Sequence, residues 1–170
     1  FSKYRVYTGT DSNSVSQTDS STSISDTSRV LTGLTNGTKY YARISAVDIW
    51  GNQSAASVAI SGTPNDTTPP STPTLISATG GNLTIDLTWS KNNNSDFKRY
   101  RIYRGTSPGA TAQIDSVSLI SDTTKTISAL IPGVTLYYRI RTLDSANNLS
   151  GYSNELSASS VDQTPPSAIT

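Results

Sequence analysis

The stretch Phe1-Ser-Lys-Tyr-Arg-Val-Tyr-Thr-Gly-Thr10 returns 96 residues later as Phe97-Lys-Arg-Tyr-Arg-Ile-Tyr-Arg-Gly-Thr106. The same shift brings Ile24-Ser-Asp-Thr27 onto Ile120-Ser-Asp-Thr123 without a gap. Each copy alternates apolar or aromatic residues with polar ones, which is the period of a half-buried strand. Similarity of a chain to itself at one fixed period is typical of tandem domains that share a fold. The repeat therefore predicts more than one copy of the same β-rich domain.

The phase of the repeat predicts the domain boundaries. Residues 71–161 form one complete unit, and residues 1–63 correspond to the second two-thirds of a unit. Between them lies the Pro-rich linker 64–70, while residues 162–170 form a second linker and the start of a further domain. We therefore expect a window from a longer array, with the first domain incomplete. Proline restricts the backbone dihedral angles of the linker, so it is expected to act as a short, semi-rigid spacer.

Period-2 alternation in the complete unit predicts seven short strands. The segment Leu83–Trp89 is the clearest, because Leu, Ile, Leu and Trp fall on one side of it and Thr, Asp and Thr on the other. Eleven of the 12 acidic residues are Asp, so the strong helix former Glu is scarce. Seven strands in fewer than about 100 residues predict an all-β sandwich. The predicted strands are 74–79, 83–89, 98–104, 112–118, 125–129, 136–144 and 155–160.

Several of these positions resemble the fibronectin type III family in its bacterial extracellular form. Trp89 ends the second predicted strand, Tyr100 opens the third, and Leu130 precedes the turn Ile131-Pro-Gly133. In the first unit, Leu34-Thr-Asn-Gly-Thr-Lys-Tyr40 is similar to the family's tyrosine corner, in which the Tyr40 hydroxyl would bond to the turn backbone. The complete unit has Leu136 at this position and so lacks the hydroxyl. The resemblance implies immunoglobulin-like sandwiches and an extracellular or cell-surface location.

Composition excludes several classes of function. The chain contains no Cys, Met or His, so it has no thiol nucleophile, no disulfide, no imidazole base and no ordinary zinc or copper site. Its formal net charge of +1 predicts no basic field for nucleic acid. We see no apolar run near the roughly 20 residues that a membrane span needs. We expect no catalytic residues, no cofactor, no membrane insertion and no enzymatic activity.

Trp50 is the most conspicuous candidate for a binding residue. It lies in the loop Asp48-Ile-Trp-Gly-Asn52, and an exposed Trp can stack on a sugar ring or anchor an interface. Its equivalent one repeat later is Ala146, which argues against a repeated binding function. We therefore expect Trp50 to pack against a preceding domain or within its own loop, and not to bind a ligand.

A set of oxygen-bearing side chains recurs near the domain junction. The hard oxygen ligands of such a group suit Ca²⁺. Asp and Asn in short turns more often cap their own backbone through side-chain hydrogen bonds, and two acids with one amide are a thin ligand set. We therefore predict no metal site here. The residues considered are Asp48 with Asn52, Asp144 with Asn148, and the linker acids Asp66 and Asp162.

These features predict a structural and interaction protein. The first interpretation is a segment of a secreted or cell-surface bacterial protein whose repeats space or present other modules, with adhesion as one such role. The alternative is a set of accessory modules of a secreted polysaccharide-degrading enzyme. A third interpretation is a carbohydrate-binding module that uses Trp50 and the strand tyrosines, but it would need several aromatics on one exposed face, whereas we expect these tyrosines to alternate into the core. The expected partners are neighbouring domains of the same chain, together with an unidentified protein or glycan.

Overall fold

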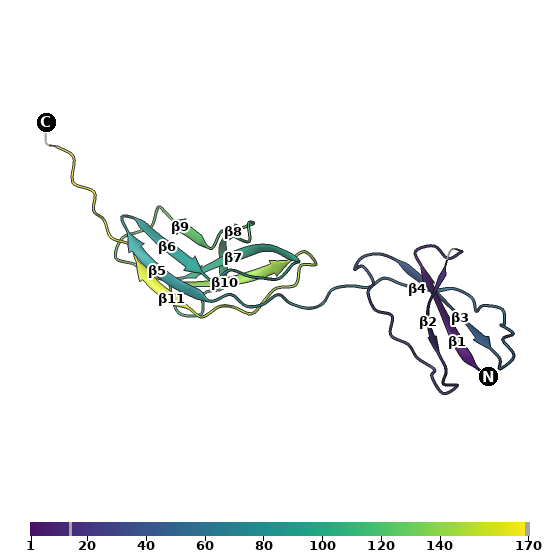
Figure 1. The fold of residues 1–170 in the computed structure, drawn as a ribbon. Coiled ribbons are helices and arrows are strands. Elements are labelled where there is room, and N and C mark those ends of the chain that lie inside the picture. Colours follow the sequence, from purple (N-terminus) through teal and green to yellow (C-terminus); the bar gives the residue numbers. More distant parts are fainter. Residues whose placement is uncertain (14, 169–170) are drawn as a thin grey trace. The chain divides into compact units, whose positions relative to one another are not determined.

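The chain forms two compact units, Phe1–Asp66 and Thr67–Thr170 (Figure 1). The computed structural model describes residues 1–13 and 15–168, and all regular elements among them are strands. Of the predicted start of a further domain, residues 169 and 170 lie outside this description. The first unit contains β1 (Lys3–Gly9), β2 (Ser16–Ser21), β3 (Tyr40–Val47) and β4 (Ile60–Gly62). The second contains β5 (Leu75–Gly81), β6 (Thr84–Trp89), β7 (Phe97–Gly105), β8 (Ala112–Val117), β9 (Thr124–Ile127), β10 (Thr135–Asp144) and β11 (Leu156–Ser159).

The second unit is a sandwich of two antiparallel sheets, as predicted. One sheet has the order β11-β10-β7-β8 and the other β5-β6-β9, and Figure 1 shows the two layers facing each other. Between them, Trp89 packs edge-on against Tyr100, with ring centroids 5.4 Å apart. All seven predicted strands are present, with ends that differ by at most two residues. The core also contains Leu75, Ile85, Leu87, Ile102, Ile127, Leu130, Leu136, Tyr138 and Ile140.

Alternation along β6 explains how this strand joins the core. Ile85, Leu87 and Trp89 are buried, whereas Asp86 between them is exposed. The prediction that Leu83 belongs to the same strand is wrong. Its φ of 55° places it in the left-handed region, and β6 begins only at the next residue. The preceding strand β5 ends at Gly81, so Leu83 is needed to turn the chain back.

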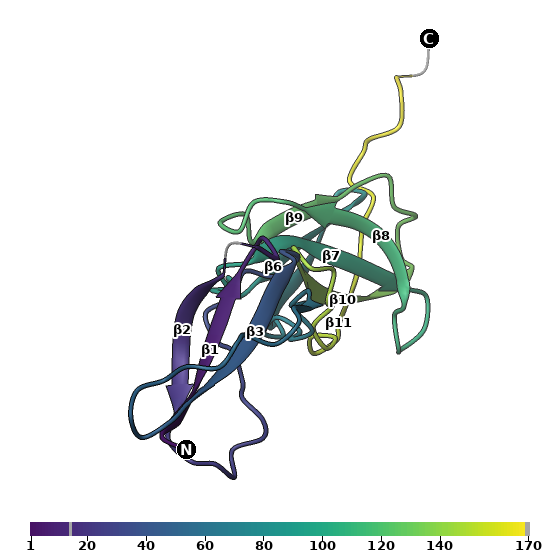
Figure 2. The same ribbon diagram turned by 90° about the vertical axis from the view of Figure 1, so that its right-hand side faces the viewer.

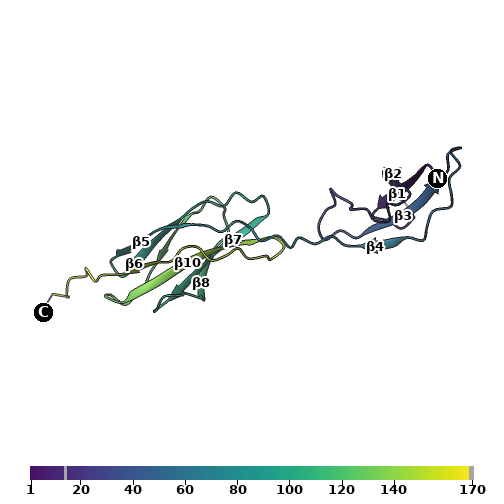
Figure 3. The same ribbon diagram turned by 90° about the horizontal axis from the view of Figure 1, so that it is seen from below.

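The first unit repeats one sheet of the second. Its order β2-β1-β3-β4 matches β8-β7-β10-β11, and β2 coincides with β8 after a shift of 96 residues. Figures 2 and 3 show these strands side by side. The part of this unit that the structure describes has no facing sheet. Its inner face is open: Ile44 is 48% exposed, whereas its equivalent Ile140 is fully buried.

Two apolar grooves mark this open face. One, of about 400 Å³, is lined mainly by Val6, Ala42, Ile44, Val58 and Ile60. The other, of about 340 Å³, lies around Leu31, Leu34 and Tyr40. In the second unit, the equivalents of most of these residues belong to the core that β5, β6 and β9 cover. The inner face of the first unit therefore has the apolar composition of a sandwich core, but no second sheet among the described residues covers it.

The tyrosine corner of the first unit is confirmed. The backbone N–H of Thr35 donates to the Tyr40 hydroxyl at 3.1 Å. This bond lowers the pKa of Tyr40, because a phenolate accepts it more strongly than a neutral phenol. In the second unit, Leu136 is buried in the core at the same position. There the apolar side chain replaces the hydrogen bond by packing.

Candidate functional site

Asp48 closes the loop that contains Trp50. Its Oδ1 accepts the backbone N–H of Trp50 at 2.9 Å and that of Asn52 at 2.8 Å, and its Oδ2 accepts the Asn52 side-chain amide at 2.8 Å. The bond from the Asn52 side chain is the main reason why the pKa of Asp48 is lowered. Both carboxylate oxygens thus cap the loop itself, as the sequence predicted.

The same turn occurs in the second unit. Asp144 Oδ1 accepts the Asn148 backbone N–H at 2.7 Å, and Oδ2 accepts the Asn148 side-chain amide at 2.9 Å. Asp144 is completely buried, so these bonds offset the cost of removing a carboxylate from water. Capping of the loop backbone is therefore the role of both Asp–Asn pairs.

Trp50 does not pack within its loop, contrary to one of the two expectations for it. Its side chain is 82% exposed. The hydrogen bonds of Asp48 already hold the loop, so its geometry does not require burial of the indole. Whether Trp50 contacts a ligand or another domain stays a prediction. The sequence thus predicted the capping hydrogen bonds of this loop correctly, but not the exposure of Trp50.

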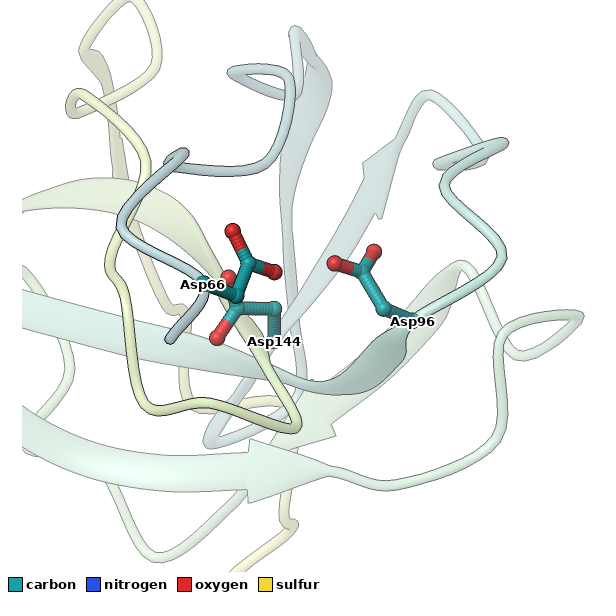
Figure 4. A group of neighbouring side chains, drawn as sticks. All are labelled: Asp66, Asp96 and Asp144. Atoms are coloured by element: carbon teal, nitrogen blue, oxygen red, sulfur yellow. The ribbon is translucent and has the colours of Figure 1, made fainter. Parts of the chain in front are cut away.

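Two carboxylates of the second unit lie close together. Ligand atoms of Asp96 and Asp144 are within 4.8 Å of each other (Figure 4). The sequence paired Asp66 with Asp144, but it missed Asp96, which precedes β7 and lies far from both along the chain. The other linker acid, Asp162, accepts the N–H of Thr164 at 2.9 Å and is not in this group. The capping bonds of Asp144 compete with any cation for its oxygens.

We predict that Ca²⁺ leaves the thermal stability of the chain unchanged. A site with a Kd of about 1 mM would add about 1.4 kcal/mol at roughly 10 mM Ca²⁺, which raises the melting temperature of a domain of this size by several degrees. Circular dichroism melts with Ca²⁺ and with matched ionic strength in NaCl measure this. A rise that Asp96→Asn abolishes would contradict the prediction, because that variant removes a carboxylate but keeps the capped turn of Asp144.

The outer face of the β10–β7 pair carries a cluster of cationic and aromatic side chains. Tyr152 lies under two guanidinium groups, with the Cζ atoms of Arg141 and Arg139 at 4.6 and 5.5 Å from its ring centroid. Tyr103 meets the Tyr152 ring edge-on at 5.0 Å. Glu155 pairs with Arg139 at 2.9 Å. These contacts fix the aromatic rings and the guanidinium groups in one arrangement.

Glu155 is held in its charged form. Burial raises its pKa, but hydrogen bonds from the backbone N–H groups of Ala110 and Gly109, together with Arg139, outweigh this and lower the pKa below its usual value. The bond from Ala110 N measures 2.9 Å. The carboxylate therefore anchors the loop at Gly109 as well as Arg139.

Comparisons with known proteins find two relatives in sequence and a solved structure with a similar fold. No family model matches the chain. It is 32% identical over 168 residues to chitinase A1 of Niallia circulans, covering 95% of this chain and 22% of that protein. It is also 32% identical over 148 residues to exoglucanase B of Cellulomonas fimi, covering 82% of this chain and 13% of that protein. The chain thus spans less than a quarter of the length of either relative.

A solved structure identifies the architecture. The FN1–FN3 domains of chicken CNTN1 match with a TM-score of 0.54 and 14% identity, over 94% of this chain and 56% of that one. At this identity the similarity concerns the fold alone, and it agrees with the predicted immunoglobulin-like, fibronectin type III sandwich. None of the described residues forms a helix with the length and apolar character needed to cross a membrane.

Proposed function

We propose that this chain, which has the fibronectin type III fold, is a set of non-catalytic accessory modules of a larger secreted bacterial enzyme that degrades polysaccharides. The observation that carries the proposal is the match to a chitinase over 168 residues, which runs through both units and the linker. The match to an exoglucanase over 148 residues supports the same class of parent protein. In such a protein the repeats space and present the other modules.

The linker supports the role of a spacer. Residues 64–70 contain three prolines, which restrict the backbone to extended conformations. Within the first unit, the N–H of Gly37 donates to the carbonyl of Pro64 at 2.8 Å, which fixes the start of the linker. Within the second, the carboxamide of Asn92 donates to the Ser71 carbonyl at 2.9 Å and so fixes the segment that follows it.

The exposure of Trp50 favours a second candidate function, direct binding of a neutral polysaccharide. An indole that is 82% exposed has a free face for stacking on a sugar ring. Against this, the turn of Asp144 and Asn148, which has the same two Asp–Asn hydrogen bonds, has Ala146 in place of Trp50. We therefore keep the spacer as the proposal, and sedimentation with insoluble polymers separates the two functions.

Two observations test the proposal. The flanking several hundred residues of the parent chain are expected to contain a glycoside hydrolase domain, whereas cell-surface anchoring and adhesive modules in their place would overturn it. Mixed with insoluble chitin or cellulose, the 170-residue chain is expected to stay in solution and to release no reducing ends. Sedimentation that Trp50→Ala abolishes, with the circular dichroism spectrum retained, would establish the binding function instead.

A further inference from the structure

Two arginines face each other on the outer side of the second unit. Arg101 of β7 lies between the fully buried Tyr100 and Ile102, and Arg141 of β10 lies between Ile140 and Thr142, which are also fully buried. Since successive side chains of a strand point to opposite faces, both arginines lie on the outer face. The register pairs them directly across the two strands.

Such a pair is unfavourable for the sheet itself. Like charges directly opposite each other destabilise an antiparallel pair. Among the described residues, the ion pairs are those of Arg29, Lys125 and Arg139, so neither Arg101 nor Arg141 has a carboxylate partner. Proteins tend to retain such locally unfavourable features at functional sites. The feature points to a ligand that supplies the missing negative charge.

Arg141 is oriented in advance. Arg141 Nε donates to the Ser150 carbonyl at 2.7 Å, and its Cζ lies 4.6 Å from the ring centroid of Tyr152. Holding a long side chain in place before binding reduces the entropy that binding costs. We call this surface the arginine–tyrosine face and define it by the outward residues of β7 and β10 with Tyr152. It comprises Arg99, Arg101, Tyr103, Arg139, Arg141 and Tyr152.

The outer face recurs in the first unit. Arg5, Tyr7 and Arg43 stand 96 residues before Arg101, Tyr103 and Arg139 and occupy the same places in the register. Inward positions on the same strands recur only in part: Tyr4 and Ile44 return as Tyr100 and Ile140, whereas Val6 and Ala42 are replaced by Ile102 and Tyr138. Arg5 and Arg43 lie on the opposite face of the sheet from these residues, so packing of the core does not require them to be repeated. One difference is useful: Ser45 stands where the second unit has Arg141.

We propose that the arginine–tyrosine face binds an acidic polysaccharide, a sugar polymer that carries carboxylates. The planar guanidinium group matches a carboxylate through two parallel hydrogen bonds. Outward residues of one strand repeat every roughly 7 Å, so Arg99 and Arg101 offer a row of such groups along β7. Tyr152 adds partly exposed ring surface beside them, and the buried Tyr103 supports its ring edge-on. The choice of a sugar over another polyanion rests on the proposed function.

The test uses the 170-residue chain with polygalacturonate as the probe and its fully methyl-esterified form as the uncharged control. Affinity electrophoresis over a range of salt concentrations measures binding. The chain is expected to bind the acidic polymer and not the ester. Arg101→Gln with Arg141→Ser, which installs the residue of the first unit, is expected to weaken binding about tenfold and to reduce the salt dependence.

The matched control removes two positive charges elsewhere. Lys91→Gln with Lys125→Gln is expected to change the affinity less than about twofold, since these side chains lie outside the face. Tyr152→Leu is expected to weaken binding several-fold with an unchanged salt dependence, because it removes a ring and no charge. Melting curves verify that each variant is folded.

Three results overturn the proposal: equal binding of the ester, equal losses in the arginine and lysine variants, or duplex DNA bound as well as polygalacturonate through the same arginines. None of them affects the proposed role as accessory modules, which the flanking sequence tests separately.

Discussion

Limited proteolysis of the 170-residue chain is expected to leave a resistant fragment near residues 64–162, while residues 1–63 are digested. Ile60 on the inner face of the first unit is 69% exposed, and Ile44 beside it is 48% exposed. Burying four apolar side chains of this size is worth about 6–12 kcal/mol, which is comparable to the whole stability of a small domain. Because the described part of the first unit has no facing sheet, its four strands lack this hydrophobic stabilisation.

A graft provides the control. Residues 71–96 placed directly before Phe1 restore the register of the repeat, since residue 96 precedes Phe97 as the graft would precede Phe1. This graft is expected to protect residues 1–63, because it supplies strands equivalent to β5 and β6. The same graft with Leu87→Asp should fail to do so. Equal protection of residues 1–63 in the ungrafted chain, shown to be a monomer, would contradict the prediction.

Trp89→Ala is expected to destabilise the second unit by about 3–5 kcal/mol, a large part of the stability of a domain of this size. Trp89 is 1% exposed and packs between the sheets against Tyr100. Replacing it with Ala leaves a cavity that the β6 and β7 backbones cannot fill by small shifts. Chemical denaturation followed by circular dichroism, with the transition of the second unit analysed, measures the loss.

Two variants make the comparison specific to burial. Trp50→Ala removes the same indole from a site that is 82% exposed, so its effect is expected to stay below about 0.5 kcal/mol. Trp89→Phe should cost less than Trp89→Ala, because it keeps most of the apolar surface and removes an Nε1–H that is buried without a hydrogen-bond partner among the described residues. Equal losses for Trp50→Ala and Trp89→Ala would mean that burial of Trp89 does not stabilise the sandwich.

The inner and outer faces of the sheet in the first unit depend on different contacts. Its inner residues require a second sheet over them for stability, whereas Arg5 and Tyr7 on the outer side are positioned by β1 and by Gln53 in the loop after β3. Tyr7 accepts the Gln53 side-chain amide at 2.6 Å, and Arg5 donates to the Gln53 carbonyl oxygen at the same distance. Digestion of residues 1–63 would therefore remove Arg5, Tyr7 and Arg43 and leave the arginine–tyrosine face of the second unit intact.

Local sequence pattern was enough to predict the strands of the second unit, the side of each strand that is buried, and the turns that cap their own backbone. Alternation placed Ile85, Leu87 and Trp89 in the core, and the Asp48–Asn52 turn predicted that Asp48 caps the loop backbone. These features depend on residues within a few positions of one another. Local periodicity and local hydrogen bonding are therefore sufficient to predict them.

Which distant residues meet could not be predicted from local pattern and follows from the pairing of the strands. Arg101 and Arg141 oppose each other because β7 pairs with β10, a register that no local pattern specifies. The net charge of +1 gave no sign of this pair of arginines, because a sum over the whole chain does not show which charges share one face. The expectation that strand tyrosines turn inward holds for Tyr100, but Tyr103 contacts Tyr152 on the outer side. The pairing of strands far apart in sequence sets these contacts, because it fixes both the neighbour and the face.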